Sequence, residues 1–369
     1  MPDGKMDLRI YCWEGYDSPV ILDPFRHRYG IDVQARTLIS DVEAAHEIDR
    51  QSPLERADIL NINNAWVQKF LHPRGAIRTL QGNHPDTTWK DSPQFAELKR
   101  WSRSVNGSQK IGICQRFGTF NFVVNTNRIS QDLAQDVGFK LAAEPDFFHR
   151  YGILLYEDFN IFHICITADI NPFQPLNSVQ ETVFKTTARD WFRNAALITD
   201  DHHSLNKALI DGQIDFYLSG GVYTASPARM EGHSQIRAIT PSQGPINGLG
   251  GIVFVEVTCA LMRPEPSPWA QPFLDYLVEP DTAIRVAFLD GTCNPVLQME
   301  NPKVLSAFSS AQLDAIQWDT LEEDISRCAH YEIVPDLPKL LAYLRKITAN
   351  YRMPKLRTDK IAIQLHYDS

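Results

Sequence analysis

The sequence has no excess of basic residues and no long apolar run. Lysine and arginine number 36 against 45 aspartates and glutamates, so the formal net charge is -9 at pH 7. Proteins that bind nucleic acid present a basic face, and this balance argues against that class. No apolar stretch approaches the roughly 18–20 residues that a membrane helix requires. The acidic balance suits a cationic solute, although many globular proteins are acidic as well.

The N-terminus lacks the pattern of a secretion signal. Residues 1–8 are polar and contain no charged segment followed by an apolar one. We therefore expect either a cytoplasmic protein or a mature form whose signal has been removed.

No two cysteines have C-x-x-C spacing, which excludes a zinc ribbon and a thioredoxin-type motif. The six thiols are widely separated, at Cys12, Cys114, Cys165, Cys259, Cys293 and Cys328. The first four lie within apolar runs, where a free thiol behaves as a small hydrophobic group. The spacing assigns no disulfide, so the cysteines leave the compartment open.

The motifs of common enzymes are also missing. There is no Gly-x-Ser-x-Gly elbow, and the glycine-rich segment 247–251 lacks the Lys-Ser/Thr of a P-loop and precedes a strand. Asp201, His202 and His203 resemble a metal-binding triplet, but no second cluster with ligand spacing accompanies them. We interpret this segment as a surface turn and expect neither metal nor cofactor. A hydrolytic metalloenzyme using these three residues remains an alternative from another functional class.

What the sequence does contain is an alternation of strand and helix signals over 43% apolar residues. Leu8–Cys12 is typical of a strand, and Pro19–Tyr29 of a helix, with Ser18 as N-cap and Gly30 as its end. The pattern then predicts strands over 31–38 and 57–62 and helices over 40–50 and 64–71. Such alternation indicates an α/β protein with a mostly parallel sheet covered by helices.

After a polar, irregular segment at 81–108, the sequence predicts two strands, over 111–114 and 121–125. A new α/β series then begins, with strands predicted over 152–156, 215–218 and 252–261, helices over 160–168, 190–196, 205–211, 269–277 and 280–288, and a polar stretch over 174–187. The first two strands are expected to be separate, with Arg116 to Thr119 between them. The C-terminal third is polar.

Extended segments near 117–124 and 247–254 join the two series. We expect two lobes connected by more than one crossing strand, the first formed by 7–118 plus 252–312 and the second by 119–251 plus 313–369. A cleft between such lobes is the usual place for a small ligand.

The opening string LRIYCWEGY at residues 8–16, followed by Phe25 and YGIDV at 29–33, resembles the start of spermidine/putrescine-binding proteins, the solute receptors of polyamine ATP-binding-cassette importers. Weaker matches continue in the family's order at 57–60, 118–125, 151–155, 212–215, 290–295 and 317–318. The resemblance implies the two-lobed type II periplasmic binding protein fold, in which hinge-connected α/β lobes close on a ligand. It also implies a monomeric, non-enzymatic periplasmic receptor that works with an ABC transporter permease.

Matched position by position, the family's ligand contacts fall on the first strand end and on later polar residues. The resemblance implies contacts from Trp13, Glu14, Tyr16, Asn63, Asn64, Asp158, Phe254, Glu256, Thr292 and Asp319. There are departures from the family pattern, because Ser219 replaces a tryptophan, Thr292 replaces a tyrosine, and Phe162 stands where some members have an acid. The family's aromatic box is therefore expected to be partly dismantled here.

A polyamine site needs a carboxylate for each ammonium and aromatic faces for the methylenes. Residues that could supply acids or rings are Glu14, Asp158, Glu256, Asp319, Trp13, Tyr16, Phe117 and Phe254. Glu256 interrupts an otherwise apolar strand, where a charge is rarely buried without a partner.

Arg116 does not suit a purely polycationic ligand. It could pair with one of the acids, or its guanidinium could grip a ligand carboxylate. The second arrangement would favour an amino acid or an opine-like compound. The expected ligand is a small cationic amine such as putrescine or spermidine, and an amino-acid or opine-like ligand is the alternative. A receptor that reports to a signalling protein instead of a transporter is a further alternative.

Overall fold

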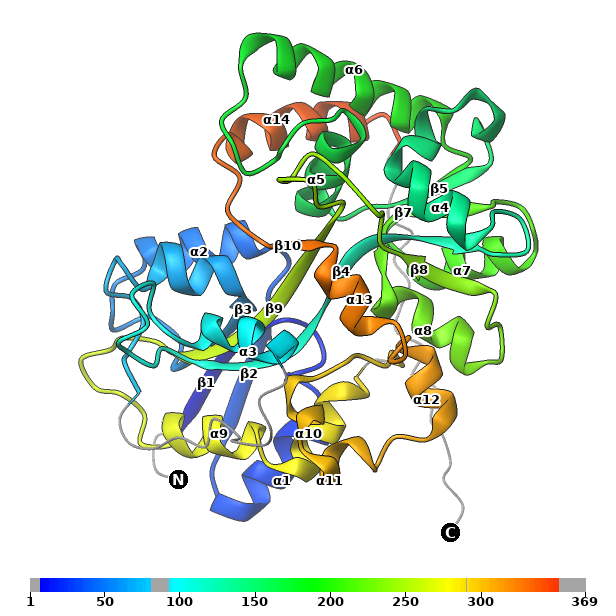
Figure 1. Ribbon diagram of the computed structural model, residues 1–369. Helices are drawn as coiled ribbons and strands as arrows, with labels where there is room; N and C mark the ends of the chain where they lie inside the picture. The colour runs from blue at the N-terminus through cyan, green and yellow to red at the C-terminus, as the bar shows by residue number, and fades with distance from the viewer. Residues whose placement is uncertain (1–6, 81–92, 290, 352–369) are drawn as a thin grey trace.

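The computed structural model describes residues 7–80, 93–289 and 291–351 (Figure 1). In these ranges one curled mixed sheet has the strand order β2-β1-β3-β9-β4-β7-β5-β6, with β10 beside β9 and β8 beside β4. Its strands are β1 (Leu8–Cys12), β2 (Val33–Thr37), β3 (Ile59–Asn63), β4 (Ile113–Asn125), β5 (Tyr151–Leu154), β6 (Leu197–Thr199), β7 (Phe216–Gly221), β8 (Ile236–Ile239), β9 (Gly251–Ala260) and β10 (Cys328–His330).

Strands β4 and β9 pass through the middle of the sheet and join two groups of parallel strands. β1 runs parallel to β2 and β3, and β5 runs parallel to β6 and β7. β9 is antiparallel to β3 and to β4, and β4 is antiparallel to β7. We call β1–β3 with their helices the β1 half of the molecule, and β5–β8 with theirs the β5 half.

Helices cover both ends of this sheet (Figure 1). α5, α6 and α14 pack together on the β5 half, whereas α1, α9, α10 and α11 lie on the β1 half. The α-helices are α1 (Pro19–Tyr29), α2 (Asp41–Arg50), α3 (Pro93–Lys99), α4 (Gln131–Val137), α5 (Glu157–Thr167), α6 (Ser178–Asn194), α7 (His202–Ile210), α8 (Val222–Met230), α9 (Ala270–Leu277), α10 (Pro280–Ala287), α11 (Pro302–Leu305), α12 (Ser310–Ala315), α13 (Leu321–Ser326) and α14 (Leu337–Thr348). A π-helical segment spans Trp66–Leu71, and 3-10 turns span Arg100–Ser102, Gly138–Ala143, Pro145–Phe147 and Leu297–Glu300.

The first helix forms as its local signals predict. The Ser18 side chain accepts a hydrogen bond from the Val20 backbone N–H, and Pro19 occupies the first helical position. Gly30 ends the helix in the left-handed region, at φ 64, where glycine carries no steric cost. Residues 13–18 connect the end of β1 to the start of this helix.

Three predictions about the elements are wrong. The segments over 111–114 and 121–125 belong to one 13-residue strand, β4, whose register shifts between Cys114 and Phe117 without ending the strand. The polar stretch over 174–187 and the short helix over 190–196 are largely one helix, α6, opened by an Asn177–Gln180 capping box. Part of the expected irregular segment is helical at α3, while residues 81–92 lie outside the described residues.

Two hydrophobic clusters pack in the molecule, and the cysteines belong to them. All six thiols are free and buried. Within the described ranges, no helix is both long enough and apolar enough to cross a membrane.

Candidate functional site

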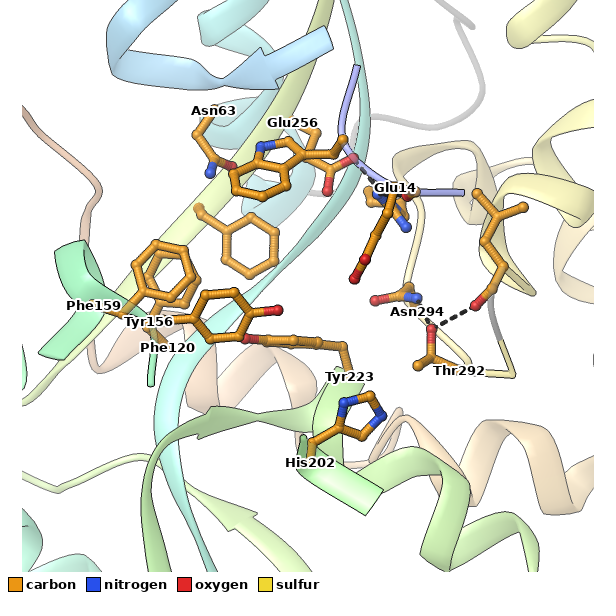
Figure 2. A pocket seen from close by; sticks show the side chains of 14 residues that line it. Glu14, Asn63, Phe120, Tyr156, Phe159, His202, Tyr223, Glu256, Thr292 and Asn294 are labelled. Atoms are coloured by element: carbon orange, nitrogen blue, oxygen red, sulfur yellow. Dashed lines mark hydrogen bonds and ion pairs between the residues drawn. The ribbon is translucent and has the colours of Figure 1, made fainter. Parts of the chain in front are cut away.

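A pocket lies where the ends of strands from both halves meet (Figure 2). It holds about 720 Å³ of empty space, a figure that includes its open mouth. Its walls consist of Trp13, Glu14, Asn63, Arg116, Phe120, Tyr156, Phe159, His202, Tyr223, Phe254, Glu256, Leu289, Thr292 and Asn294.

The β1 half supplies Trp13 and Glu14 directly after the carboxyl end of β1. Gly15 follows at φ 95, and its N–H donates to Asp17 Oδ1 over 3.0 Å, so the chain turns sharply here. The turn leaves the Glu14 side chain exposed and pointing into the pocket, toward Tyr156 and Tyr223 (Figure 2).

A buried carboxyl group behind the pocket wall holds two lining residues in place. Asp41, at the start of α2, accepts hydrogen bonds from Trp13 Nε1 over 3.0 Å and from Asn63 Nδ2 over 2.7 Å. Burial raises the pKa of Asp41 to about 6, against the lowering effect of the hydrogen bonds from Asn63 and Trp13. Asp41 therefore positions the indole and the amide without lining the pocket itself.

The two central strands contribute an ion pair to the pocket wall. Arg116 on β4 donates from Nε to Glu256 Oε2 on β9 over 2.9 Å, and from Nη2 to the Glu14 backbone carbonyl over 3.3 Å. Both side chains are largely buried, and the guanidinium carbon lies 4.8 Å from the centre of the Tyr16 ring. Of the two roles considered for Arg116, the structure therefore places it in an ion pair with a site acid, in a position that still faces the pocket.

Aromatic rings form the wall between the two halves. The Phe120 ring on β4 stacks on Phe254 of β9, with centroids 4.5 Å apart and planes 18° apart. Phe159 of α5 lies 3.8 Å from Phe120 between centroids, and Tyr223 meets Phe254 edge-on at 6.2 Å. This wall offers flat apolar faces, the surfaces that aromatic and methylene groups of a ligand prefer.

The β5 half adds three residues, each just after a parallel strand. Tyr156 follows β5, His202 follows β6 and Tyr223 follows β7. Burial raises the pKa of both tyrosines. The Glu14 carboxylate raises the pKa of Tyr156 further. Burial also lowers the pKa of His202 to about 4, so its imidazole is neutral near pH 7. This wall therefore carries no charge of its own.

A loop after α10 closes the remaining side. Thr292 Oγ1 donates to the Leu289 carbonyl oxygen over 2.8 Å, and Asn294 Nδ2 donates to Thr292 Oγ1 over 2.8 Å. Gly291, directly before Thr292, has a φ of 73°, a backbone conformation that glycine adopts without steric cost. The loop thus presents amide and hydroxyl groups beside Glu14 (Figure 2).

The structure brings together seven of the residues that the sequence singles out. These lining residues are Trp13, Glu14, Asn63, Arg116, Phe254, Glu256 and Thr292. Their assignment as ligand contacts stays a prediction.

Six other candidates do not line the pocket, and each has a different environment. Tyr16 lies beneath Arg116, and Asn64 ties β9 to the segment after β10 through Val255 N–H and the Tyr331 carbonyl. Phe117 packs against Phe95 in the core.

The remaining three lie on the β5 side or in the C-terminal third. Asp158, in the first turn of α5, is partly buried and outside the lining set. Ser219 is buried and accepts a hydrogen bond from Asn160 Nδ2 over 2.7 Å, with His163 Nδ1 at 3.0 Å. Asp319 is exposed in a turn after α12.

The residues that the sequence did not indicate are mainly those of the β5 half: Tyr156, Phe159, His202 and Tyr223, together with Phe120, Leu289 and Asn294. The interpretation of 201–203 as a surface turn is wrong for His202, which lines the pocket. Strand order would have indicated His202, because residues that follow the carboxyl ends of neighbouring parallel strands meet at one edge of a sheet.

Asp201 acts as a helix cap. Its carboxylate accepts from the backbone N–H groups of His203 and Ser204 and from the Ser204 hydroxyl. Across the described residues, no group of three or more His, Cys, Asp or Glu side chains is arranged to hold a metal ion.

Two half-sheets joined by crossing strands, with a pocket at the strand ends, make this the type II periplasmic binding protein fold. Among solved structures, the chain is similar to the spermidine/putrescine ABC transporter substrate-binding protein PotD of Streptococcus pneumoniae, with a TM-score of 0.63 and 14% identity over 92% of this chain and 98% of that one. The TpPotD lipoprotein of Treponema pallidum gives a TM-score of 0.65 at 12% identity, covering 92% and 98%.

A third similar structure is the PBP MotA of A. tumefaciens B6 in complex with glucopine. Its TM-score is 0.60 at 10% identity, covering 93% of this chain and 99% of that one. No protein-family model matches this sequence, and no curated protein matches it. At these identities the likeness shows a shared fold, and the ligand has to be argued from the pocket.

Proposed function

We propose that this protein is the solute receptor of an ABC importer and binds a small organic amine cation in the pocket between its two halves. The observation that carries the proposal is the pairing of the Glu14 carboxylate with aromatic faces in one pocket of a receptor fold. An ammonium group leaving water needs a carboxylate, and its carbon skeleton gains from ring faces.

The rest of the proposal follows from the fold class. We place the lobes at 7–118 plus 252–312 and at 119–251 plus 313–369, with boundaries within β4 and at the start of β9; residues 81–92, 290 and 352–369 of these ranges lie outside the described residues. Closure of the lobes on ligand would let a permease distinguish the loaded receptor from the empty one by shape. A periplasmic, monomeric, non-enzymatic protein fits this role. The same closure would also serve a receptor that reports to a signalling protein.

A second candidate ligand is an amine that also carries a carboxylate. Arg116 faces the pocket, and a guanidinium is well suited to a carboxylate. The similar structure with glucopine shows that an opine fits into this fold in another protein.

A thermal-shift screen tests the proposal, because a ligand that binds only the folded state raises the melting temperature. The panel contains polyamines, monoamines, quaternary amines, amino acids and opines, with sugars and carboxylic acids as other chemical classes. We expect amine cations to give the largest shifts. Shifts from sugars or simple acids with none from amines would overturn the proposal.

The variant that tests the carboxylate is Glu14→Gln, matched by Glu55→Gln at an exposed acid outside the pocket. Glu14→Gln should weaken amine binding by about 1–3 kcal/mol, because the ammonium loses a charge-assisted partner. Glu55→Gln should leave the affinity unchanged. Calorimetric titration with the best amine from the screen measures both variants, and equal affinities would remove Glu14 from the site.

A further inference from the structure

The charges on the pocket wall come from one side only. Glu14 follows β1, while Arg116 and Glu256 lie on the parts of β4 and β9 that pair near β3. Two carboxylates and one guanidinium leave a single net negative charge among the lining side chains. Glu14 is exposed and points into the pocket, whereas Glu256 is largely buried, so Glu14 is the acid best placed to receive an ammonium (Figure 2).

The facing wall offers a cation no carboxylate. Among the described lining residues, the β5 half contributes Tyr156, Phe159, His202 and Tyr223, of which none is acidic. Asp201 is engaged as the cap of α7, and Asp158 and Asp200 do not line the pocket, Asp200 acting on Tyr156 only through its charge. A second ammonium of a diamine would therefore be taken from water without a counter-charge, which costs several kcal/mol.

The aromatic wall selects the shape of the ligand's uncharged part. The Phe120 ring lies between two others, stacked on Phe254 at 18° and tilted by 32° to Phe159, so the Phe254 ring is held rigidly from behind. Tyr223 stands edge-on to Phe254, so the rings make a corner. A planar ring fills such a corner with more contact than a chain of methylenes, and aromatic pairs gain from stacked or edge-on geometry.

We infer that the ligand is an aryl-alkyl monoamine, with its ammonium at Glu14 and its ring against the corner formed by Phe120, Phe254 and Tyr223. This inference rests on the proposed function and narrows it from amine cations in general to those with one charge and one flat apolar end. Diamines and longer polyamines are disfavoured because none of the described lining residues of the β5 half is acidic.

Titration calorimetry with four probes tests this ligand class: 2-phenylethylamine, putrescine, phenylalanine and 2-phenylethanol. We expect 2-phenylethylamine to bind at least about 10-fold more tightly than each of the other three, because only it matches both the charge and the ring. Tighter binding of putrescine would overturn the inference but leave an amine receptor. Tighter binding of phenylalanine would also overturn it and favour an amine that carries a carboxylate. Binding of none of the amines would remove the proposed function as well.

A designed acid on the β5 wall gives an independent test. His202→Glu places a carboxylate at the first position of α7, where a negative charge suits the helix N-terminus. This variant should bind putrescine about 10-fold more tightly than the wild type, since the second ammonium gains a partner. His203→Glu adds the same charge one residue later, outside the lining set, and should leave putrescine binding unchanged. No gain in His202→Glu, or an equal gain in both, would contradict the missing-acid explanation.

Discussion

At the residue scale, Asp158 has a carboxyl group whose pKa is strongly raised by its surroundings. Burial raises its pKa to about 8, and the neighbouring acids Asp41 and Glu157 raise it further against the lowering effect of Arg345. The carboxyl group therefore holds its proton in the folded protein at neutral pH, whereas in the unfolded chain it is ionised above a pKa of about 3.9.

This difference predicts a pH dependence of stability. Between about pH 4 and pH 8 the folded state binds the Asp158 proton more tightly than the unfolded state, so the free energy of unfolding falls as pH rises. Asp158→Asn removes that dependence and should be more stable than the wild type by at least about 1 kcal/mol at pH 9, with little gain at pH 4. Urea unfolding of both proteins at pH 4 and at pH 9 measures this difference in stability.

The matched control is Asp319→Asn, the same substitution at an exposed acid. It should give the wild-type slope of stability against pH. A wild-type slope in Asp158→Asn would show that this carboxyl ionises normally. Amine affinity should be unchanged in both variants, because neither residue lines the pocket.

The site residues that could be predicted from the sequence share a local pattern. Trp13 and Glu14 stand together at the end of a recognisable strand, and Glu256 is a lone charge in an apolar strand. Tyr156 and Tyr223 lack such a local pattern. Each is one of twelve tyrosines, and nothing in its neighbouring sequence distinguishes it from the others. Only the parallel neighbours β5, β6 and β7 bring them and His202 to one edge, and strand order is a property of tertiary pairing.

At the element scale, β4 and β9 are held together by a buried ion pair as well as by their backbone ladder. Glu256→Gln leaves the Arg116 guanidinium buried without its 2.9 Å carboxylate partner. We expect a loss of about 2–4 kcal/mol in the free energy of unfolding, because an uncompensated buried charge is costly. Urea unfolding of the variant against the wild type measures this loss.

The double variant Arg116→Gln with Glu256→Gln isolates the interaction energy between the two side chains from the effects of each single substitution. It should be more stable than the sum of the two single losses predicts, because neither charge is left alone. Strict additivity of the three unfolding energies would show that the pair contributes no coupling between the strands.

The elements themselves were predictable where their signals are local. Ser18, Pro19 and Gly30 mark the ends of α1 within a few residues, so its bounds were predicted correctly. The segment from Arg116 to Thr119 was predicted to separate two strands, but the pairing of β4 with β9 continues through it, with Gly118 opposite Phe254. α6 was missed because most of its residues are polar, although its buried residues Phe184, Ala188 and Trp191 recur at the spacing of one helix face.

At the scale of the whole molecule, Arg345 links the two halves. From α14, its Nε contacts Glu157 of α5 over 2.7 Å and its Nη2 contacts Glu43 of α2 over 3.3 Å. α14 packs on α5 and α6 in the β5 half, whereas α2 belongs to the β1 half. The Glu43 contact therefore favours the arrangement in which the halves are close together.

Arg345→Gln should weaken ligand binding by up to about 5-fold, with a smaller effect at high salt, because an exposed ion pair contributes about 1 kcal/mol or less. Lys339→Gln is the matched control: it removes a pair between α14 and Glu181 of α6, both in the β5 half. Its affinity should equal that of the wild type. Equal losses in the two variants, measured by calorimetry at low and high salt, would contradict a linking role for Arg345.

The central position of β9 also has a consequence for how the chain can fold. β1–β3 come from the first 63 residues, yet the strand beside β3 is β9, which is complete only at Ala260. During synthesis, the β1 half therefore keeps an open sheet edge until nearly 200 further residues have been made. We therefore expect this protein to fold slowly for its size, because completing the β1 half requires contacts between residues far apart in the sequence.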